Sequence, residues 1–295
     1  MFQKVSRMQP CKICGKSDWC SFTFEYVICK RISSGSINEK LDRNGEQYWV
    51  HSVKSDVHQG TPSAILKARA VKNLALTKVV NQDILKLLNL ASEDRDELHR
   101  RGLSDPQVET GQYRSFYSFS TRVLIARLLE RYTFEELLQV PGFYAKSKTD
   151  LMMSKLDGLM IPIRAADGAI TAFKIRRRYV QDGQNRFLLL SNHLGVSAGN
   201  ELHVPIFPVN DSKTLRLTEG ELKADIATVF SSVKTIGIPG VSSWRTAIPY
   251  VKESGCDHLI LSFDSDLYEN PRVRRALVEA YKAFKNITSV GIEKW

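Results

Sequence analysis

The 295-residue sequence predicts an α/β protein with an N-terminal zinc-binding β module and a helical connector. A mixed α+β subdomain with a β-meander and a C-terminal parallel-sheet domain complete the predicted fold. Three observations predict it: a cysteine cluster before residue 30, strand-like runs separated by turns over 157–190, and strands that alternate with helices from residue 214. Such alternation is typical of βαβ units. The predicted domains are 1–60, 61–205 and 206–295.

The charge balance favours a polyanionic partner. Forty-two Lys and Arg against 32 Asp and Glu give a net charge of +10 and an isoelectric point near 9.3. Nucleic acid is the expected partner, although the same balance fits a basic protein without one. No apolar run reaches the ~18 residues of a membrane span, and the N-terminus lacks a secretion signal. We therefore expect a cytoplasmic protein.

Four cysteines predict a structural zinc site. Cys11 and Cys14 form a CxxC, and Cys20 and Cys29 supply a second pair. Aromatic residues alternate with polar ones over 22–26, which predicts a β-hairpin that brings the second pair together. Clustered cysteines without a secretion signal indicate metal ligands rather than disulfides. Four thiolates close a tetrahedral site and leave no open position for catalysis.

Other interpretations of this segment stay open. The cysteines could be reduced thiols in a small core, and His51 and His58 could replace a ligand. His51 ends the strand-like run YWVHSV, which favours a structural role. Cys256 precedes an apolar strand and is also interpreted as structural. The connector over 62–91 and the capped helix that stops at Gly102 are assigned no chemistry.

The segment 157–190 predicts a β-meander with a basic middle strand. Alternation along AITAFKIRRRYV places Lys174, Arg176 and Arg178 on one face. Three like charges on one strand face repel each other, and a phosphate chain lying across them would relieve that repulsion. The alternative is an exposed, charged edge strand that prevents aggregation.

The C-terminal region places acidic residues at strand ends. Glu219 ends the first predicted strand, and Asp264 and Asp266 end the third. Sites in parallel sheets lie at the carboxyl ends of the strands. Converging carboxylates repel unless a cation joins them, and hard oxygen ligands suit Mg²⁺ or Mn²⁺. Gly220 permits close approach of a substrate, and Lys223 lies one helical turn beyond Glu219, within reach of a phosphate. Ordinary helix-capping acids are the alternative.

These motifs resemble a known family. LTEGELKAD followed by LILSFDSD resembles the TOPRIM domain of bacterial primases, topoisomerases and some nucleases. DGLMIPIRAADGAITAFKIRRR and NRFLLLSN resemble the stretch before TOPRIM in DnaG-type primases, and HRRGLSDPQVETGQYRSF resembles the helical entry to that core. The resemblance spans 11–29 and about 93–295, and is nearest to primase-like replication proteins of plasmids, phages and mobile elements.

The resemblance implies a DNA primase that makes short primers on single-stranded DNA from nucleoside triphosphates. Glu219, Asp264 and Asp266 would bind two catalytic Mg²⁺ or Mn²⁺ ions. Nucleotide or template phosphates would lie against a basic set: Lys174, Arg176, Arg178, Arg186 and Lys223. It also implies start-site selection by the zinc module, a replicative helicase partner, and a nucleoid-associated protein of bacterial, phage or plasmid origin.

The sequence departs from the chromosomal pattern in ways that leave alternatives open. All four zinc ligands are Cys where a His is usual, and Lys223 stands where an acid is usual. The sequence stops at Trp295, before the further acids of TOPRIM primases, so we expect a fragment of a longer protein or an incomplete metal site. A TOPRIM nuclease and a catalytically degenerate replication-initiator protein are the alternative functions.

Overall fold

The computed structural model describes residues 3–6, 8–23, 26–41, 47–52, 72–192, 194–264 and 270–293. The chain divides into two compact units, Met1–Thr61 and Pro62–Trp295. The first part of the predicted connector, residues 62–71, lies outside the described residues. Within the described part of the chain, no helix combines the length and the apolar character needed to cross a membrane.

The first unit is a small antiparallel sheet with the strand order β1-β2-β3-β5-β4. Its strands are β1 (Gln3–Lys4), β2 (Ser21–Phe22), β3 (Tyr26–Cys29), β4 (Asn38–Leu41) and β5 (Gln47–Ser52). Strands β2 and β3 pair antiparallel, with Ser21 opposite Ile28. The hairpin predicted between Cys20 and Cys29 is therefore confirmed. So small a core, built on Val5, Val27 and the cysteines, needs a further source of stability.

The second unit begins with helices around an antiparallel sheet. The sheet order is β11-β10-β9-β6, from β6 (Arg114–Phe116), β9 (Gly158–Arg164), β10 (Ile170–Arg177) and β11 (Phe187–Leu189). The helices are α2 (Leu74–Leu87), α3 (Ser92–Arg100), α4 (Asp105–Gly111), α5 (Thr121–Leu129) and α6 (Phe134–Leu137), and β7 (Phe143–Ala145) pairs with β8 (Leu151–Met153). The predicted β-meander is confirmed as β9, β10 and β11.

Strand β10 lies inside the sheet. It pairs with β9 on one side and with β11 on the other. The interpretation of this segment as an edge strand is therefore wrong. Phe173 and Ile175 point into the core beneath α2 and α5, so Lys174 and Arg176 face the opposite side, toward α3 and α7. Arg178 lies just beyond the end of the strand.

A four-stranded parallel sheet follows, in the order β13-β12-β14-β15. Its strands are β12 (Asp211–Glu219), β13 (Val233–Ile238), β14 (His258–Ser262) and β15 (Ser289–Ile292), and its helices are α7 (Glu221–Ser231), α8 (Ile248–Ser254) and α9 (Pro271–Phe284). The predicted alternation is confirmed. Between β13 and β14 the chain forms two helical pieces, a 3-10 helix (Val241–Ala247) and α8, because Pro249 has no N–H to continue a single helix.

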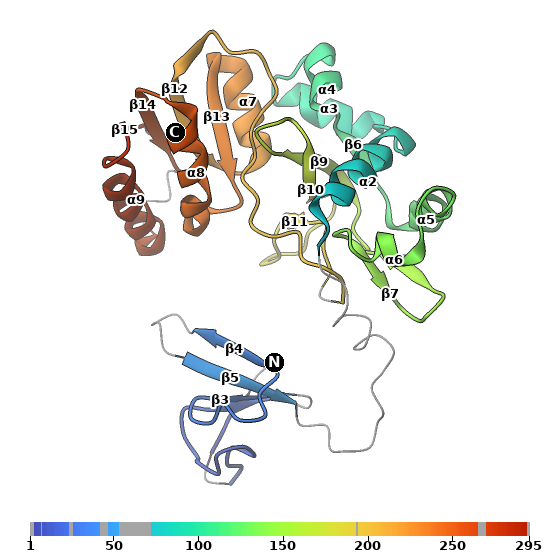
Figure 1. The fold of residues 1–295 in the computed structure, drawn as a ribbon, viewed down its shortest axis with the longest axis vertical. Helices are drawn as coiled ribbons and strands as arrows, with labels where there is room; N and C mark the ends of the chain where they lie inside the picture. The colour runs from blue at the N-terminus through green and yellow to red at the C-terminus, as the bar shows by residue number, and fades with distance from the viewer. Residues whose placement is uncertain are drawn as a thin grey trace. The chain divides into compact units, whose positions relative to one another are not determined.

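Helix α7 lies between the two sheets (Figure 1). Leu222 packs into a cluster with Leu98 of α3 and Leu159 and Ile161 of β9, and α7 also packs against β13. The opposite face of the parallel sheet is covered by α8 and α9. The predicted division near residue 205 stays a prediction, since both sheets belong to one compact unit.

A buried polar network fixes the two sheets to each other. Asp225 of α7 accepts hydrogen bonds from Tyr113 (2.7 Å) and from His203 Nε2 (3.0 Å). His203 Nδ1 accepts the backbone N–H of Arg164 on β9, so its Nε2 carries the proton. All three polar side chains are almost fully buried. Because buried polar groups are costly to leave unpaired, this network resists relative movement of the two sheets.

Candidate active site and zinc site

Glu219 and Asp264 come from adjacent parallel strands. Thr218 of β12 lies opposite Ser262 of β14, and its hydroxyl donates to the Ser262 carbonyl at 2.8 Å. Glu219 is the last residue of β12, and Asp264 follows β14 by two residues. The strand register therefore brings the two acids to one edge of the sheet, as the sequence predicts. Asp266 lies outside the described residues.

The environment of Glu219 suits a cation ligand. Its Oε2 accepts the backbone N–H of Val241 at 3.0 Å, whereas its Oε1 is buried without a hydrogen-bond partner in the described part of the chain. Burial and the nearby Asp264 carboxylate raise the pKa of Glu219, and the backbone N–H groups of Val241 and Asp264, with the Lys223 ammonium, oppose that shift. A carboxylate oxygen that is buried and unpartnered fits a hard divalent cation.

A glycine shapes the start of helix α7 beside these acids. Gly220 has φ +85°, a conformation that side chains rarely adopt, and it turns the chain from β12 directly into the helix. Lys223, in the first turn, forms an ion pair with Asp264. A pocket of about 290 Å³ opens here, lined by Arg101, Lys174, Phe187, Glu219, Gly220, Glu221, Leu222, Lys223, Pro239 and Asp264.

The three predicted phosphate-binding residues of this segment, Lys174, Arg176 and Arg178, all have carboxylate partners. Lys174 Nζ lies 2.6 Å from Glu221 Oε2, and Arg176 lies 2.8 Å from Glu97 Oε1. Arg178 lies 2.5 Å from Asp94 Oδ2. The assumption that these three charges are left to repel each other is therefore wrong, because acids from α3 and α7 neutralise them. Their role in phosphate binding stays a prediction.

An excess of positive charge gathers around Glu97. Arg100, Arg101 and Arg176 all contact this one carboxylate. Burial lowers the pKa of Arg176, and repulsion from Arg101, Arg186 and Arg100 adds to the shift. Arg186 is exposed, with no carboxylate partner among the described residues. We name Arg100, Arg101, Arg176 and Arg186 the arginine cluster.

The sequence interpretation missed Arg100 and Arg101. It assigned no chemistry to the helix that stops at Gly102, because nothing local in the sequence RRG marks a contact with a distant strand. Glu221 was also missed, although its place directly after Glu219 and Gly220 was a usable sign. Its Oε1 is buried without a hydrogen-bond partner in the described part of the chain.

The four N-terminal cysteines form one cluster. The sulfurs of Cys11, Cys14, Cys20 and Cys29 all lie within 4.8 Å of one another, and Cys14 Sγ lies 3.8 Å from Cys20 Sγ. A tetrahedral site with bonds of about 2.3 Å places its sulfurs about 3.8 Å apart, so this donor set fits Zn²⁺. Burial raises the pKa of Cys20 to about 12 and also raises that of Cys29. A bound cation would therefore be needed to keep all four as thiolates.

The surroundings of the cluster are polar and basic. Arg31 Nη1 lies 3.9 Å from Cys14 Sγ and 3.7 Å from Cys20 Sγ, and Arg31 Nη2 lies 2.7 Å from Asp18 Oδ1. His51 is buried, and its Nε2 lies 2.9 Å from the Ile32 carbonyl. The structural interpretation of His51 agrees with this position. His58, the other alternative ligand, lies outside the described residues.

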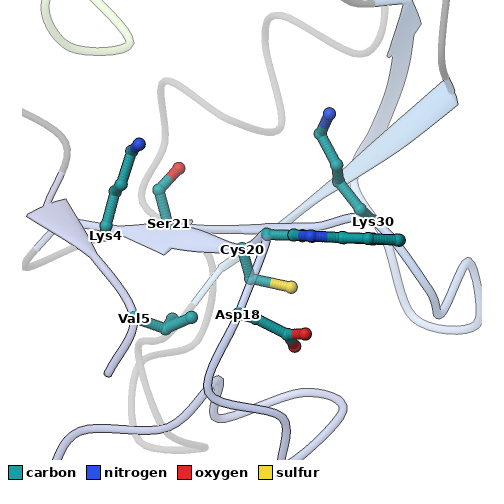
Figure 2. A pocket seen from close by; sticks show the side chains of 7 residues that line it. Lys4, Val5, Asp18, Cys20, Ser21 and Lys30 are labelled. Carbon is teal, nitrogen blue, oxygen red and sulfur yellow. The ribbon is translucent and has the colours of Figure 1, made fainter. Parts of the chain in front are cut away.

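A second pocket, of about 530 Å³, lies beside this cluster, lined by Lys4, Val5, Asp18, Trp19, Cys20, Ser21 and Lys30. Lys4, Ser21 and Lys30 point to the same side of it (Figure 2). Trp19 is 75% exposed and has φ +63°, a conformation that is costly for a bulky residue. The Arg31 guanidinium lies 5.2 Å from its ring centroid. An exposed indole among cations is a suitable surface for a nucleic-acid base.

Solved structures share this fold. No family model matches the chain, and no curated protein matches it. The structure of the zinc-binding and RNA polymerase domains of Aquifex aeolicus primase matches with a TM-score of 0.60 at 14% identity, over 75% of this chain and 55% of that one. The chain thus spans about 55% of the length of that protein.

Two DNA complexes are also similar. The RNA polymerase domain of Mycobacterium tuberculosis primase DnaG, solved with a double-stranded DNA oligomer that has a 6-nucleotide overhang, matches with a TM-score of 0.59 at 15% identity, over 76% of this chain and 74% of that one. A DnaG primase catalytic domain bound to single-stranded DNA matches with a TM-score of 0.55 at 12% identity, over 75% and 71%. The chain therefore has the fold of DnaG primase catalytic domains.

Proposed function

We propose that the chain is a DNA primase that makes short primers on single-stranded DNA by metal-dependent nucleotidyl transfer. One observation carries the proposal: Glu219 and Asp264 meet at adjacent strand ends in a pocket that Arg101 and Lys223 also line. Metal-ligating and phosphate-binding groups thus face the same space, on a fold like that of the primase structures. The proposal also includes a role in replication of a mobile element and a helicase partner. Both of these rest on the sequence resemblance.

The reaction joins a hydroxyl to a phosphate. The 3′-hydroxyl of a primer, or of the first nucleotide, attacks the α-phosphate of a nucleoside triphosphate, and pyrophosphate leaves. Glu219 and Asp264 would hold a divalent ion, which would supply charge to stabilise the attacking and leaving oxygens. Lys223 and Arg101 lie where they can hold the triphosphate, and Asp266 is a further proposed ligand.

The arginine cluster is the proposed contact for phosphates of the template or the nucleotide. Its guanidinium groups outnumber the one carboxylate between them, so an approaching phosphate meets a net positive surface. Lys174 and Arg178 each form an ion pair with a buried carboxylate. We propose that they position this surface and that Arg101 and Arg186 contact the phosphates.

The first unit is proposed to bind the template as well. Zn²⁺ would stabilise a module whose apolar core is small. Trp19 offers an exposed ring for base stacking, and Lys4 offers charge for the backbone at the same pocket. Contacts of this kind would help to select a start site on single-stranded DNA.

The test is primer synthesis. The protein is incubated with single-stranded DNA, labelled NTPs or dNTPs, and Mg²⁺ or Mn²⁺, and the products are separated by length. We expect short oligomers that require template and metal, and none from Glu219→Gln. Glu253→Gln, a change at an exposed acid on α8, serves as the control and should leave synthesis intact.

A TOPRIM nuclease is the second candidate, because the same acids could bind metal for cleavage. Cleavage of DNA without added nucleotides, and no oligomers under any metal, would replace the primase proposal. If the protein binds DNA but neither synthesises oligomers nor cleaves DNA, the replication-initiator interpretation is favoured.

A further inference from the structure

The pocket at the strand ends already contains a positive charge beside its acids. Lys223 projects from the first turn of α7 and pairs with Asp264, and both line the pocket with Glu219. We propose that the Lys223 ammonium takes the place of a second divalent cation, so that the chain binds one Mg²⁺ or Mn²⁺ at Glu219 and Asp264. This inference rests on the proposed function and deepens it.

The charges at the pocket leave little capacity for two divalent ions. Among the described residues that line it, three are acids. Glu221 is committed to Lys174 in an ion pair with both side chains almost fully buried. Glu219 and Asp264 remain, and Asp266, the further proposed ligand, would add a third negative charge. Lys223 offsets one of the three, so the set balances the charge of one divalent ion. A two-metal site needs its ions about 3.5–4 Å apart, held by enough carboxylates to offset their repulsion.

The position of Lys223 also favours a role in the pocket. A cation in the first turn of a helix meets the positive end of the helix dipole, which is unfavourable. Lys223 is the third residue of α7, and helical side chains lean toward the N-terminus of their helix. Its ammonium is therefore directed back to the strand ends, where Asp264 offsets the unfavourable position.

The charge of Lys223 reaches both acids. It contacts Asp264 directly, and it lines the same pocket as Glu219. A fixed ammonium at this place repels a second divalent ion, whereas Glu219 Oε1, which has no hydrogen-bond partner among the described residues, remains available to one ion. Lys223 is thus a positioning residue that sets metal number and affinity.

The test counts bound Mn²⁺ on the full zinc-loaded chain, by electron paramagnetic resonance of the free ion and by calorimetry. Thiolate sites do not compete for a cation that prefers oxygen ligands. We expect the wild type to bind one Mn²⁺ that Glu219→Gln removes. Lys223→Gln should bind this ion about tenfold more tightly, because a nearby positive charge is removed. Lys223→Glu should gain a second ion.

Lys252→Gln, which changes an exposed lysine of α8, is the matched control and should behave as the wild type. Two bound ions in the wild type would overturn the inference and leave the proposed function standing. Unchanged or weaker Mn²⁺ binding in Lys223→Gln would also overturn it. If neither the wild type nor Lys223→Glu binds Mn²⁺, the metal chemistry of the proposed function fails, and this inference fails with it.

Discussion

Lys174 and Glu221 form a buried ion pair that joins strand β10 to the first residue of helix α7, with 2.6 Å between Nζ and Oε2. Their side chains are 8% and 1% exposed. The pair connects the antiparallel sheet to the parallel sheet at the wall of the pocket that holds Glu219. It therefore bears on stability and on the shape of the proposed active site together.

Breaking this pair should be costly. Lys174→Met leaves the Glu221 carboxylate buried without its partner, and such a change costs about 3–5 kcal/mol of unfolding free energy. The double variant Lys174→Met with Glu221→Leu should recover part of it. Denaturant unfolding measures both. Lys78→Met breaks a more exposed pair with Asp167 and should cost less than about 1 kcal/mol. Equal destabilisation at the two sites would contradict the importance given to burial.

Glu219→Gln should stabilise the metal-free protein in a pH-dependent way. The folded-state pKa of Glu219 is raised by burial and by Asp264, so the folded protein binds more protons than the unfolded chain above the ordinary carboxyl value of about 4.3. Stability contributed by protonated Glu219 is present below that value and is lost as pH rises through the folded pKa. Gln stays neutral and avoids this loss.

The measurement is thermal unfolding of wild type and Glu219→Gln, without divalent ions, at pH values from 4 upward. We expect the difference to grow as pH rises to neutrality. Added Mg²⁺ should then stabilise the wild type but not Glu219→Gln. Glu253→Gln should match the wild type in both its pH dependence and its response to Mg²⁺. A variant that is less stable at every pH would mean that Glu219 has a structural role.

Zinc should stabilise the first unit and have no effect on the stability of the second. Cys29→Ser removes a buried ligand from the cluster of four, so elemental analysis should show loss of about one Zn²⁺ per chain. Limited proteolysis should then cut within Met1–Thr61 and spare Pro62–Trp295, because the two units have separate cores. Cys256→Ser changes the fifth cysteine and should retain zinc. Full zinc content in Cys29→Ser would exclude the four-cysteine site.

The arginine cluster should determine the salt dependence of DNA binding. Arg101→Ala and Arg186→Ala should each reduce the slope of log K against log salt by about 0.7 on single-stranded DNA, because one fewer phosphate is neutralised and fewer counterions are released. Arg275→Ala changes an exposed arginine of α9 and should leave the slope unchanged. Slopes that match the wild type in both cluster variants would place the nucleic-acid surface elsewhere.

Trp19 should contribute by stacking. Trp19→Ala should weaken single-stranded DNA binding by about 1–3 kcal/mol, the usual contribution of one stacked base. Trp19→Phe should keep most of the affinity because it keeps an aromatic face. Met8→Ala, which removes another exposed apolar side chain of the first unit, is the control. Equal affinities for all three variants, measured by fluorescence anisotropy of labelled DNA, would count against a site at this pocket.

Local patterns predicted the framework of the fold well. The hairpin around Cys20 and Cys29, the three meander strands and the strands that carry Glu219 and Asp264 all follow from signals within short stretches. Hydrophobic periodicity and turn residues act over such distances, so one sequence suffices to predict them. Pro249 shows the limit of such local signals. A proline indicates that a helix is interrupted, but it does not indicate that the turns before it form a 3-10 helix.

Partnerships between distant residues were not predictable. Glu97 and Asp94 lie on a helix far along the chain from Arg176 and Arg178, and they meet only because α3 packs over β10. The basic strand therefore looked like three unpaired charges in the sequence. The pairing of Lys223 with Asp264 likewise depends on strand register, which alternation alone does not reveal.

The backbone bridge between His203 and Gly237 also has a consequence for solubility. Strand β13 is an outer strand of the parallel sheet, and outer strands can recruit strands from other molecules. His203 exchanges two backbone hydrogen bonds of 2.8 Å with Gly237 of β13. The segment that leads into the parallel sheet therefore covers part of the free edge of β13. Because the same histidine also bonds Asp225, aggregation through β13 would first require the buried network to open.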